Sequence, residues 1–517
     1  MHDRDELYVL AVDLGTGGPK IGLVSVPGIA AWQTHVPVET IYGERRAATQ
    51  DAEAWWTIIS GAAKQAFAET TIEPSQVVGV GITAQWASTI PVDAAGHPVG
   101  DCVMWMDGRG GKDVRRRIGG RFGGYSLRSI LTWLRRAGAP PSLGGDDAAG
   151  HLAFFSGVGA STGDLARWFL EPADYLSMRF TGVAAASPAS MCAAWLIDTR
   201  VPGTCTYDQA LIRRLGIDGS KLPPLVPTGS IVGTVTEKAA IETGLLAGTP
   251  VVTGLPDLHS ATIGSGAVGD FEPHLAISTT SWLSCPVTKK KTDISHSIAT
   301  VPGVTPDRYL VVDNQDSGGR CLDWYRESLR TSTGDVPSYE ELLAMAATAP
   351  AGSGNVVFTP WLAGERTPIS DRHARAGFQN LGLGTTSAHL ARAVLEGVAM
   401  NSRWLLQEAE RFTGRRLEPI RIIGGGAQSP LWCQIMADVT NRTIEQVIDP
   451  RNANLRGMAL FTARSLGLVQ HEEIRGLMAI TQTFEPNPEH RTTYDTLFKA
   501  FTELYTAQKK LFRLLNP

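Results

Sequence analysis

The chain has 517 residues, of which 43% are hydrophobic and 19% charged, and its formal net charge is −4 at pH 7. This composition excludes disordered and fibrous proteins, and the length predicts two large domains rather than one. The nearly balanced charge argues against nucleic acid or an anionic membrane surface as a partner.

Cysteine usage and the N-terminal residues bear on the compartment. The six cysteines stand singly and form no Cys-x-x-Cys pair, which argues against a zinc or redox motif and favours free buried thiols. Residues 1–7 are charged and lack the apolar stretch of a signal peptide, and no apolar run has the length of a membrane span. These features predict a cytoplasmic protein.

The first half opens with two short β-rich runs, residues 8–12 and 20–26, on either side of the turn 13–18 (DLGTGG). This order predicts a strand, a tight glycine turn and a second strand. The other elements expected in this half are a helix over 55–67, a buried strand over 76–83 and a loop over 138–150.

The second half continues the alternation of strands and helices. A long helix is expected to begin at Thr386-Ser387 and to end at Gly414, and Ser429-Pro430 has the order of a helix cap followed by the first helical residue. Strands are expected over 250–254, 274–281, 355–359 and 421–423. The alternation predicts an α/β fold with a domain boundary between 255 and 275. A strand–turn–strand near the start of each half indicates a duplicated fold.

Three small-residue turns follow strands and have the composition of phosphate-binding loops. Phosphate groups need several converging backbone N–H donors, which glycine and small hydroxyl residues permit sterically. The turns are 13–18, 278–281 and 424–427, and the last precedes a capped helix, whose N-terminus suits a nucleotide. An ordinary hairpin turn is the alternative for the first, and a polar strand end for the second.

Four segments resemble the motifs of the FGGY family of carbohydrate kinases, within the superfamily of actin-like and heat-shock ATPases, and their texture is closest to that of its xylulose kinases. They are DLGTG at 13–17, VMWMDGR at 103–109, LEPADYL with RFTG across 170–182, and GGGAQSPLW at 424–432. The resemblance extends from about residue 8 to residue 468. It implies two ribonuclease H-like domains of the actin-like ATPase type, 1–268 and 269–517, with a cleft between them.

The resemblance also implies an activity: phosphorylation of a hydroxyl on a small sugar by ATP with Mg²⁺, the first domain binding the sugar and the second the adenosine. The acceptor is expected to be a pentulose such as xylulose or a related ketose or polyol. A homodimer is expected on the same ground, without nucleic-acid or membrane partners.

The family pattern places the general base at Asp257, which also contacts the sugar. Read from its neighbours alone, this residue is an isolated carboxylate after a buried strand, where a helix N-cap is the alternative role. Asp13 is expected to hold magnesium, while Lys20 is expected to be solvated. The expected nucleotide contacts are Thr16, Gly17, Thr279, Thr280, Gly425, Gly426 and Ala427.

The expected acceptor contacts are Gln85, Trp86, Ala87, Asp107 and Asp257. A packed core position is the alternative for Trp86, and an ion pair with Arg109 is the alternative for Asp107.

Three departures from the family pattern bear on the acceptor and the nucleotide. Trp86-Ala87 stands where xylulose kinases have Met-His, and Leu258 follows the base in place of Asn or Gln. Ser278 stands where the second phosphate motif normally has glycine. The sequence therefore specifies neither the acceptor sugar nor the hydroxyl that reacts.

Two other classes of function are alternatives. One is a catalytically weak regulatory protein that binds sugar and nucleotide in the same fold. The other is an actin-like or chaperone ATPase, against which the segment 105–109 and the adenosine motif argue.

Overall fold

Two mixed sheets, one from each half of the chain, form the framework of the computed structural model, which describes residues 6–516. In the first sheet the strand order is β11-β12-β6-β1-β2-β3, with β13 also paired to β6. Their bounds are β1 (Tyr8–Gly15), β2 (Gly18–Ser25), β3 (Ala30–His35), β6 (Val77–Ala84), β11 (Ile231–Thr234), β12 (Pro250–Val252) and β13 (Leu255–Pro256).

The second sheet repeats this plan in the order β15-β14-β22-β23-β24. Its strands are β14 (His274–Ile277), β15 (Ser281–Ser284), β22 (Ile420–Ile423), β23 (Ile444–Val447) and β24 (Ile480–Phe484). In both sheets the first two strands form an antiparallel hairpin, and the first strand then pairs in parallel with a strand from much later in the chain. The predicted duplication and the α/β class are confirmed.

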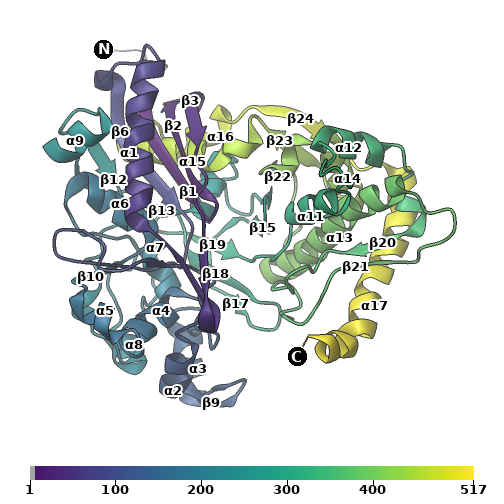
Figure 1. Ribbon diagram of the computed structural model, residues 1–517, viewed down its shortest axis with the longest axis horizontal. Coiled ribbons are helices and arrows are strands. Elements are labelled where there is room, and N and C mark those ends of the chain that lie inside the picture. Colours follow the sequence, from purple (N-terminus) through teal and green to yellow (C-terminus); the bar gives the residue numbers. More distant parts are fainter. Residues whose placement is uncertain (1–5, 517) are drawn as a thin grey trace.

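The helices lie on and between these sheets (Figure 1). They are α1 (Ala52–Glu69), α2 (Gly111–Ile118), α3 (Leu127–Arg136), α4 (Ala148–Phe155), α5 (Ala160–Leu165), α6 (Pro172–Thr181), α7 (Pro188–Met191), α8 (Gln209–Leu215), α9 (Glu237–Thr243), α10 (Asp257–Gly264), α11 (Arg320–Ser328), α12 (Tyr339–Ala347), α13 (Ser387–Thr413), α14 (Pro430–Thr440), α15 (Ala453–Ser465), α16 (Ile474–Leu477) and α17 (Arg491–Leu515). Among the described residues, no helix combines the length and the apolar character needed to cross a bilayer.

All but one of the remaining strands form small satellite sheets. They are β4 (Ile41–Gly43), β5 (Ala47–Gln50), β7 (Ile90–Val92), β8 (Cys102–Val103), β10 (Trp168–Leu170), β16 (Pro286–Val287), β17 (Thr292–Asp293), β18 (Ile298–Pro302), β19 (Tyr309–Val312), β20 (Val357–Thr359) and β21 (Gly377–Gln379). The exception, β9 (Gly119–Phe122), makes isolated bridges to Tyr125.

Helix ends follow the local sequence closely. Gly414 ends α13 in the left-handed conformation at φ 73°, and the Ser429 hydroxyl caps α14 by accepting from the backbone N–H of Trp432 at 3.2 Å. The loop predicted over 138–150 is too long. Asp147 caps a helix there by accepting from the N–H of Gly150, so α4 begins at Ala148.

One helix of the second half packs on the sheet of the first. Leu455 and Ala459 of α15 lie in one buried cluster with Val9, Ala11 and Val24 of β1 and β2. The boundary expected at residue 268 falls between α10 and β14, and α15 returns across it.

Helices α10 and α15 cross with their backbones in contact. A methyl group on Gly457 would overlap the carbonyl oxygen of Ser260, and one on Gly264 would overlap that of Ala453. Arg456 reinforces the crossing, since its guanidinium donates to the carbonyl of Gly264 at 2.8 and 3.0 Å. Only glycine permits this approach.

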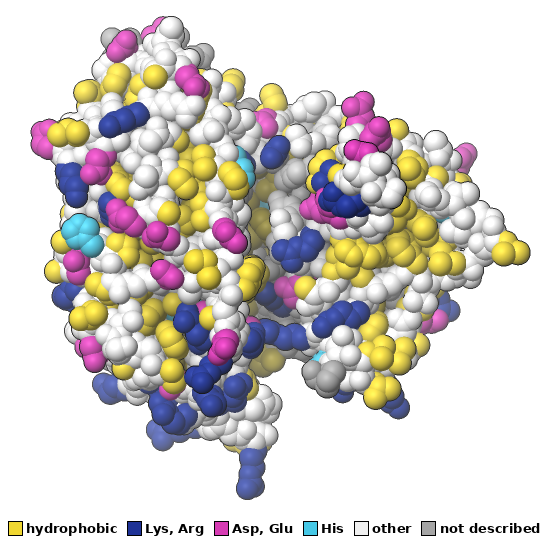
Figure 2. Space-filling model, viewed as in Figure 1, with side chains coloured by type: hydrophobic (Ala, Val, Ile, Leu, Met, Phe, Trp, Pro, Cys, Tyr) yellow, Lys and Arg dark blue, Asp and Glu magenta, His cyan; other side chains and the backbone are white. Residues whose placement is uncertain are grey.

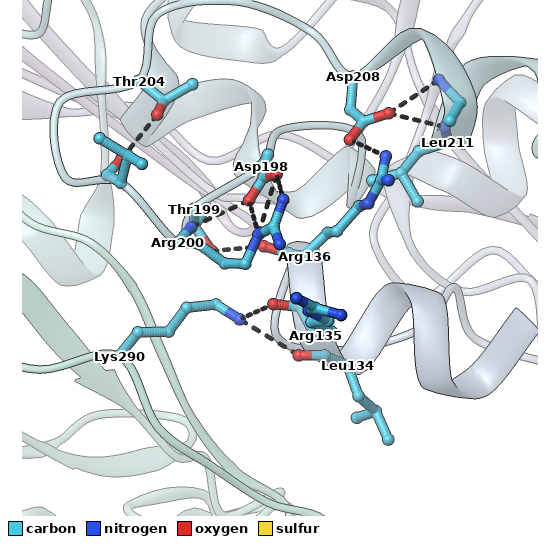
Figure 3. Close-up of polar contacts among 12 residues, drawn as sticks. Leu134, Arg135, Arg136, Asp198, Thr199, Arg200, Thr204, Asp208, Leu211 and Lys290 are labelled. Atoms are coloured by element: carbon cyan, nitrogen blue, oxygen red, sulfur yellow. Dashed lines mark hydrogen bonds and ion pairs between the residues drawn. The ribbon is translucent and has the colours of Figure 1, made fainter.

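The segment around β16–β19 ties the two halves at a second place. Figure 3 shows Lys290 Nζ donating to the carbonyls of Leu134, at 3.2 Å, and Arg135, at 3.0 Å. The hydroxyl of Tyr309 donates to the carbonyl of Thr199 at 2.8 Å. The two halves therefore meet along a polar seam as well as through α15.

We expect Gly457→Ala to lower the free energy of unfolding by about 1–3 kcal/mol or more, because the added methyl must push two helix backbones apart. Thermal unfolding measures this. Gly61→Ala in α1 is the matched control, since nothing lies within 4 Å of a methyl there, and it should leave stability unchanged or raise it. Equal effects of the two substitutions would contradict the close crossing.

Candidate active site

The ends of three parallel strands bring the predicted catalytic residues together. Asp13 on β1 lies opposite Thr83 on β6, and Leu255 on β13 lies opposite the same Thr83. Gln85 and Asp257 directly follow β6 and β13, so both emerge at the edge where Asp13 lies. The carboxyl edge of a parallel sheet is where α/β proteins bind ligands.

Asp257 is the first residue of α10, whose N-cap is Pro256. The helix N-cap alternative is therefore wrong. Its Oδ1 accepts from the N–H of Leu258 at 2.8 Å. Burial, and secondly the negative charge of Asp13, raise the pKa of Asp257 to about 7. A carboxyl with this pKa takes up and releases protons near neutral pH, as a general base must.

Asp13 is also largely buried, and burial raises its pKa, while Lys20 opposes the rise. The side chain of Asn454, on α15, is a further hydrogen-bond partner. The prediction that Lys20 is solvated is wrong. Register across the β1–β2 hairpin pairs it with Asp13, and its Nζ lies 3.8 Å from that carboxylate and donates to the carbonyl of Arg451 at 3.0 Å.

The first turn is held by a chain of side-chain hydrogen bonds. The indole of Trp105 donates to the Thr16 hydroxyl, which donates to Oε1 of Gln85, each at 3.0 Å. Gln50 donates to the carbonyl of Thr16 at 2.8 Å, and Gly17 is exposed. These hydrogen bonds fix Thr16 between the turn and Gln85, one of the predicted sugar contacts.

Trp86 and Ala87 lie in the turn after β6. Trp86 packs against two buried apolar clusters, which agrees with the alternative of a packed core position, but its side chain stays partly exposed. Its indole N–H donates to the carbonyl of Ser190 at 2.8 Å. Ala87 has φ 63°, a left-handed conformation that is unusual for a residue with a Cβ, and such strain is common at ligand sites.

Asp107 is fully buried and forms the ion pair with Arg109 that was its alternative role. One oxygen accepts from the N–H of Ala48 at 2.8 Å, and Nη2 of Arg109 lies 2.8 Å from the same oxygen. Arg109 in turn lies over the ring of Phe154, 4.6 Å from its centroid. Both carboxylate oxygens are engaged within the protein, so any role of Asp107 toward an acceptor passes through Arg109.

The second turn, residues 278–281, is in close backbone contact with a segment for which the sequence predicted no role. Gly318 donates to the carbonyl of Thr279 at 3.0 Å, and a methyl on Gly318 would lie 2.6 Å from the carbonyl of Thr280. Gly319 packs equally close to Ser278. Glycine is thus present beside this turn, in the bend directly before α11, rather than within it. The sequence pattern that could have identified this segment is the run Ser317-Gly318-Gly319 directly before a helix.

The third turn lies beside the second. Gly424 has φ 91°, and a methyl there would lie 2.5 Å from the carbonyl of Ile277 and 2.8 Å from Oγ of Ser278. Gly425 is exposed with open space around its Cα, whereas Ala427 is fully buried and its carbonyl accepts from Gln446 at 2.6 Å. The second and third turns therefore form one continuous small-residue surface.

Figure 2 shows a groove between the two halves, with Lys and Arg side chains gathered toward its lower opening. One of the groups that reach across is Arg366 from the second half, whose guanidinium lies 5.8 Å from the ring centroid of Trp105. It also pairs with Asp316 at 3.0 Å. Positive charge at this opening favours anionic ligands.

No group of three or more His, Cys, Asp and Glu side chains with the arrangement of a metal site occurs within residues 6–516. Magnesium is usually held by one or two carboxylates together with water and substrate phosphates. Asp13, the residue predicted to hold it, is a carboxylate at this sheet edge, and Asp257 is the second carboxylate there.

The family models for the FGGY carbohydrate kinase N-terminal and C-terminal domains match residues 8–130 with 161–264, and residues 276–466. The chain belongs to the FGGY family of carbohydrate kinases. It is therefore a sugar kinase, and its fold is the two-domain fold of actin-like ATPases.

Relatives of this kinase match it over nearly its whole length. A xylulose kinase of Staphylococcus epidermidis is 26% identical over 514 residues, which cover 97% of both proteins. An autoinducer-2 kinase of Yersinia enterocolitica is 26% identical over 98% of this chain and 95% of its own length. The ligand-bound structure of xylulose kinase from Lactobacillus acidophilus superposes with a TM-score of 0.85 at 22% identity, covering 98% of this chain and 99% of that one.

We expect Asp13→Asn to bring the pKa of Asp257 below about 7, because it removes the nearby negative charge that helps to raise it. Carbon-13 NMR of aspartate carboxyl groups measures the titration, with Asp257→Asn used to assign the signal. Asp307→Asn, a change at an exposed carboxylate, is the control and should leave the pKa of Asp257 where it is. An unchanged titration in Asp13→Asn would contradict the electrostatic coupling.

Proposed function

We propose that this kinase transfers the γ-phosphoryl group of ATP to a hydroxyl of a ketose or polyol, with Asp257 as the general base. The observation that carries the proposal is the position of Asp257. It is a partly exposed carboxyl at the start of α10, beside Asp13, with a pKa near 7. Phosphoryl transfer requires positioning and charge neutralisation more than covalent work by the protein, and one base near the accepting hydroxyl completes the set.

Asp13 is proposed to hold Mg²⁺, with Lys20 beside it to neutralise phosphate charge. A cation held there would supply charge neutralisation for the transferred phosphoryl group. The hairpin turn with Thr16 and Gly17 and the opposite turn with Thr279 and Thr280 are proposed to contact the phosphates through backbone N–H groups.

The surface of Gly425, Gly426 and Ala427 is proposed to receive the adenosine side of the nucleotide. Gly425 leaves open space for a planar group, while the burial of Ala427 restricts it to a supporting role beneath that surface.

On the acceptor side, Gln85, Trp86 and Ala87 are proposed to contact the sugar beside Asp257, with Asp107 acting through Arg109. The names of the relatives, which include xylulose kinase, support a pentulose or a related ketose or polyol as acceptor. A cytoplasmic location fits the use of ATP and the six free cysteines.

A panel of ketoses and polyols with ATP and Mg²⁺ tests the function, with sugar-dependent ADP formation as the readout. We expect at least one acceptor to stimulate turnover strongly, and Asp257→Asn to lower kcat by about 10²–10⁴-fold, the usual contribution of a general base. Glu503→Gln, at an exposed position on α17, is the matched control and should keep wild-type kcat. If no acceptor on the panel raised ADP formation, the function would be that of a binding protein instead.

The pH dependence of kcat/KM gives an independent measurement. A base with a raised pKa is protonated, and inactive, below that pKa. We therefore expect kcat/KM to rise about tenfold per pH unit below pH 7 and to level off above it. A profile that stays flat from about pH 5.5 to 8 would show that Asp257 does not titrate in the rate-determining step.

A further inference from the structure

Directly after Asp257, Leu258 belongs to a buried apolar cluster that also contains Cys192, Val301 and Leu310, and the partly buried Trp86 and Trp282 pack against it. We call Trp86, Cys192, Leu258 and Trp282 the apolar wall. Parallel pairing sets this arrangement, because Pro256 on β13 lies opposite Ala84 on β6. The residues that follow the two strands therefore run side by side, which brings Trp86 next to Leu258.

The polar atoms of this apolar wall are nearly all engaged within the protein. The indole N–H of Trp86 donates to the carbonyl of Ser190 at 2.8 Å, and Sγ of Cys192 contacts the carbonyl of Ala189 at 3.1 Å. Within the wall as described, Trp282 Nε1 is the side-chain polar atom without a partner, and an indole N–H donates but cannot accept. The wall therefore offers an acceptor molecule carbon surface and a single donor.

The apolar wall cannot easily turn a polar group toward the site. The ring of Trp86 packs edge-on against His259, with centroids 6.0 Å apart. His259 itself is fully buried, with its Nε2 2.8 Å from the carbonyl of Pro302 and its Nδ1 without a partner among the described residues. Behind the turn, a carboxylate oxygen of Glu171 accepts from the N–H of Ser88 at 3.2 Å and holds the left-handed backbone of Ala87.

The neighbouring pair Thr16 and Gln85 is polar. Gln85 keeps Oε1 on the Thr16 hydroxyl, and its Nε2 makes only a 3.7 Å contact with the sulfur of Met104. That amide can donate to a sugar hydroxyl. The site is thus polar on the Thr16–Gln85 side and apolar on the Trp86–Leu258 side of Asp257.

We propose that the preferred acceptor carries a deoxy or methyl carbon, rather than a hydroxyl-bearing carbon, on the side that faces Trp86 and Leu258. The acceptor class is thus a deoxy-ketose or a methyl-bearing polyol. This inference rests on the proposed function. A hydroxyl placed against the apolar wall would lose its hydrogen bonds to water and find no acceptor, whereas a methyl group fits.

Matched acceptor pairs that differ by one hydroxyl test the inference. Suitable pairs are 1-deoxy-D-xylulose with D-xylulose, and the 6-deoxy forms of L-fructose and L-tagatose with their parents, assayed by ADP formation. We expect kcat/KM to favour the deoxy member of at least one pair by about tenfold to a hundredfold, the usual cost of leaving a buried hydroxyl unpaired.

A substitution in the wall separates specificity from a general loss of activity. Leu258→Asn has nearly the same size and supplies a donor and an acceptor, and we expect it to shift the preference at least tenfold toward the hydroxylated member. Leu258→Met keeps the wall apolar and should keep the wild-type preference. Trp86→Phe should also keep it, because the indole N–H that it removes points to Ser190.

The outcomes of this test are distinct. Phosphorylation of the parents with higher kcat/KM in every pair would overturn the inference while the kinase function stands. An unchanged ratio in Leu258→Asn, in a variant with wild-type thermal unfolding, would overturn the role of the wall. Absence of sugar-dependent ADP formation with every acceptor would overturn the proposed function, and this inference with it.

Discussion

The crossing of α10 and α15 is the contact on which the rest of the site depends. Two glycines, Gly264 and Gly457, allow the helix backbones to touch, and Arg456 donates to the carbonyl of Gly264 across the crossing. Helix α10 begins with Asp257, and α15 supplies the Asn454 side chain that bonds to Asp13. One helix–helix contact therefore sets the positions of both carboxyl groups and joins the two halves.

Placing two carboxyl groups close together in a buried site disfavours their ionised forms. The raised pKa values that result suit phosphoryl transfer. Burial raises both pKa values, the charge of Asp13 adds to the rise at Asp257, and Lys20 opposes the rise at Asp13 only in part. A divalent cation would favour the ionised forms, because opposite charge lowers the pKa of a carboxyl. Under the proposed function, the site would bind metal and phosphate together and keep a proton acceptor at the adjacent strand end.

Much of the fold and part of the site could be predicted from local sequence. Gly414 and Ser429 end and begin their helices where expected, since a cap acts on backbone groups within one turn. The Asp13 turn and the Gly424 turn were recognisable because small residues after a β-rich run have few other uses. By contrast, Gly318 and Gly319 complete the second turn from a segment distant in sequence, where no local pattern tied them to it.

The sequence by itself determined the family, the duplicated α/β plan and the residue types of the three small-residue turns, because these depend on patterns within short segments. Only the tertiary structure decided that Lys20 lies beside Asp13, that α15 packs on the first sheet, and that the Trp86 indole N–H is turned away to Ser190. The physical reason is that burial, charge coupling and hydrogen-bond partners are set by groups brought together from far along the chain. Next to Asp257 these long-range contacts bring two unusual residues, Trp86 and Leu258, into one apolar wall.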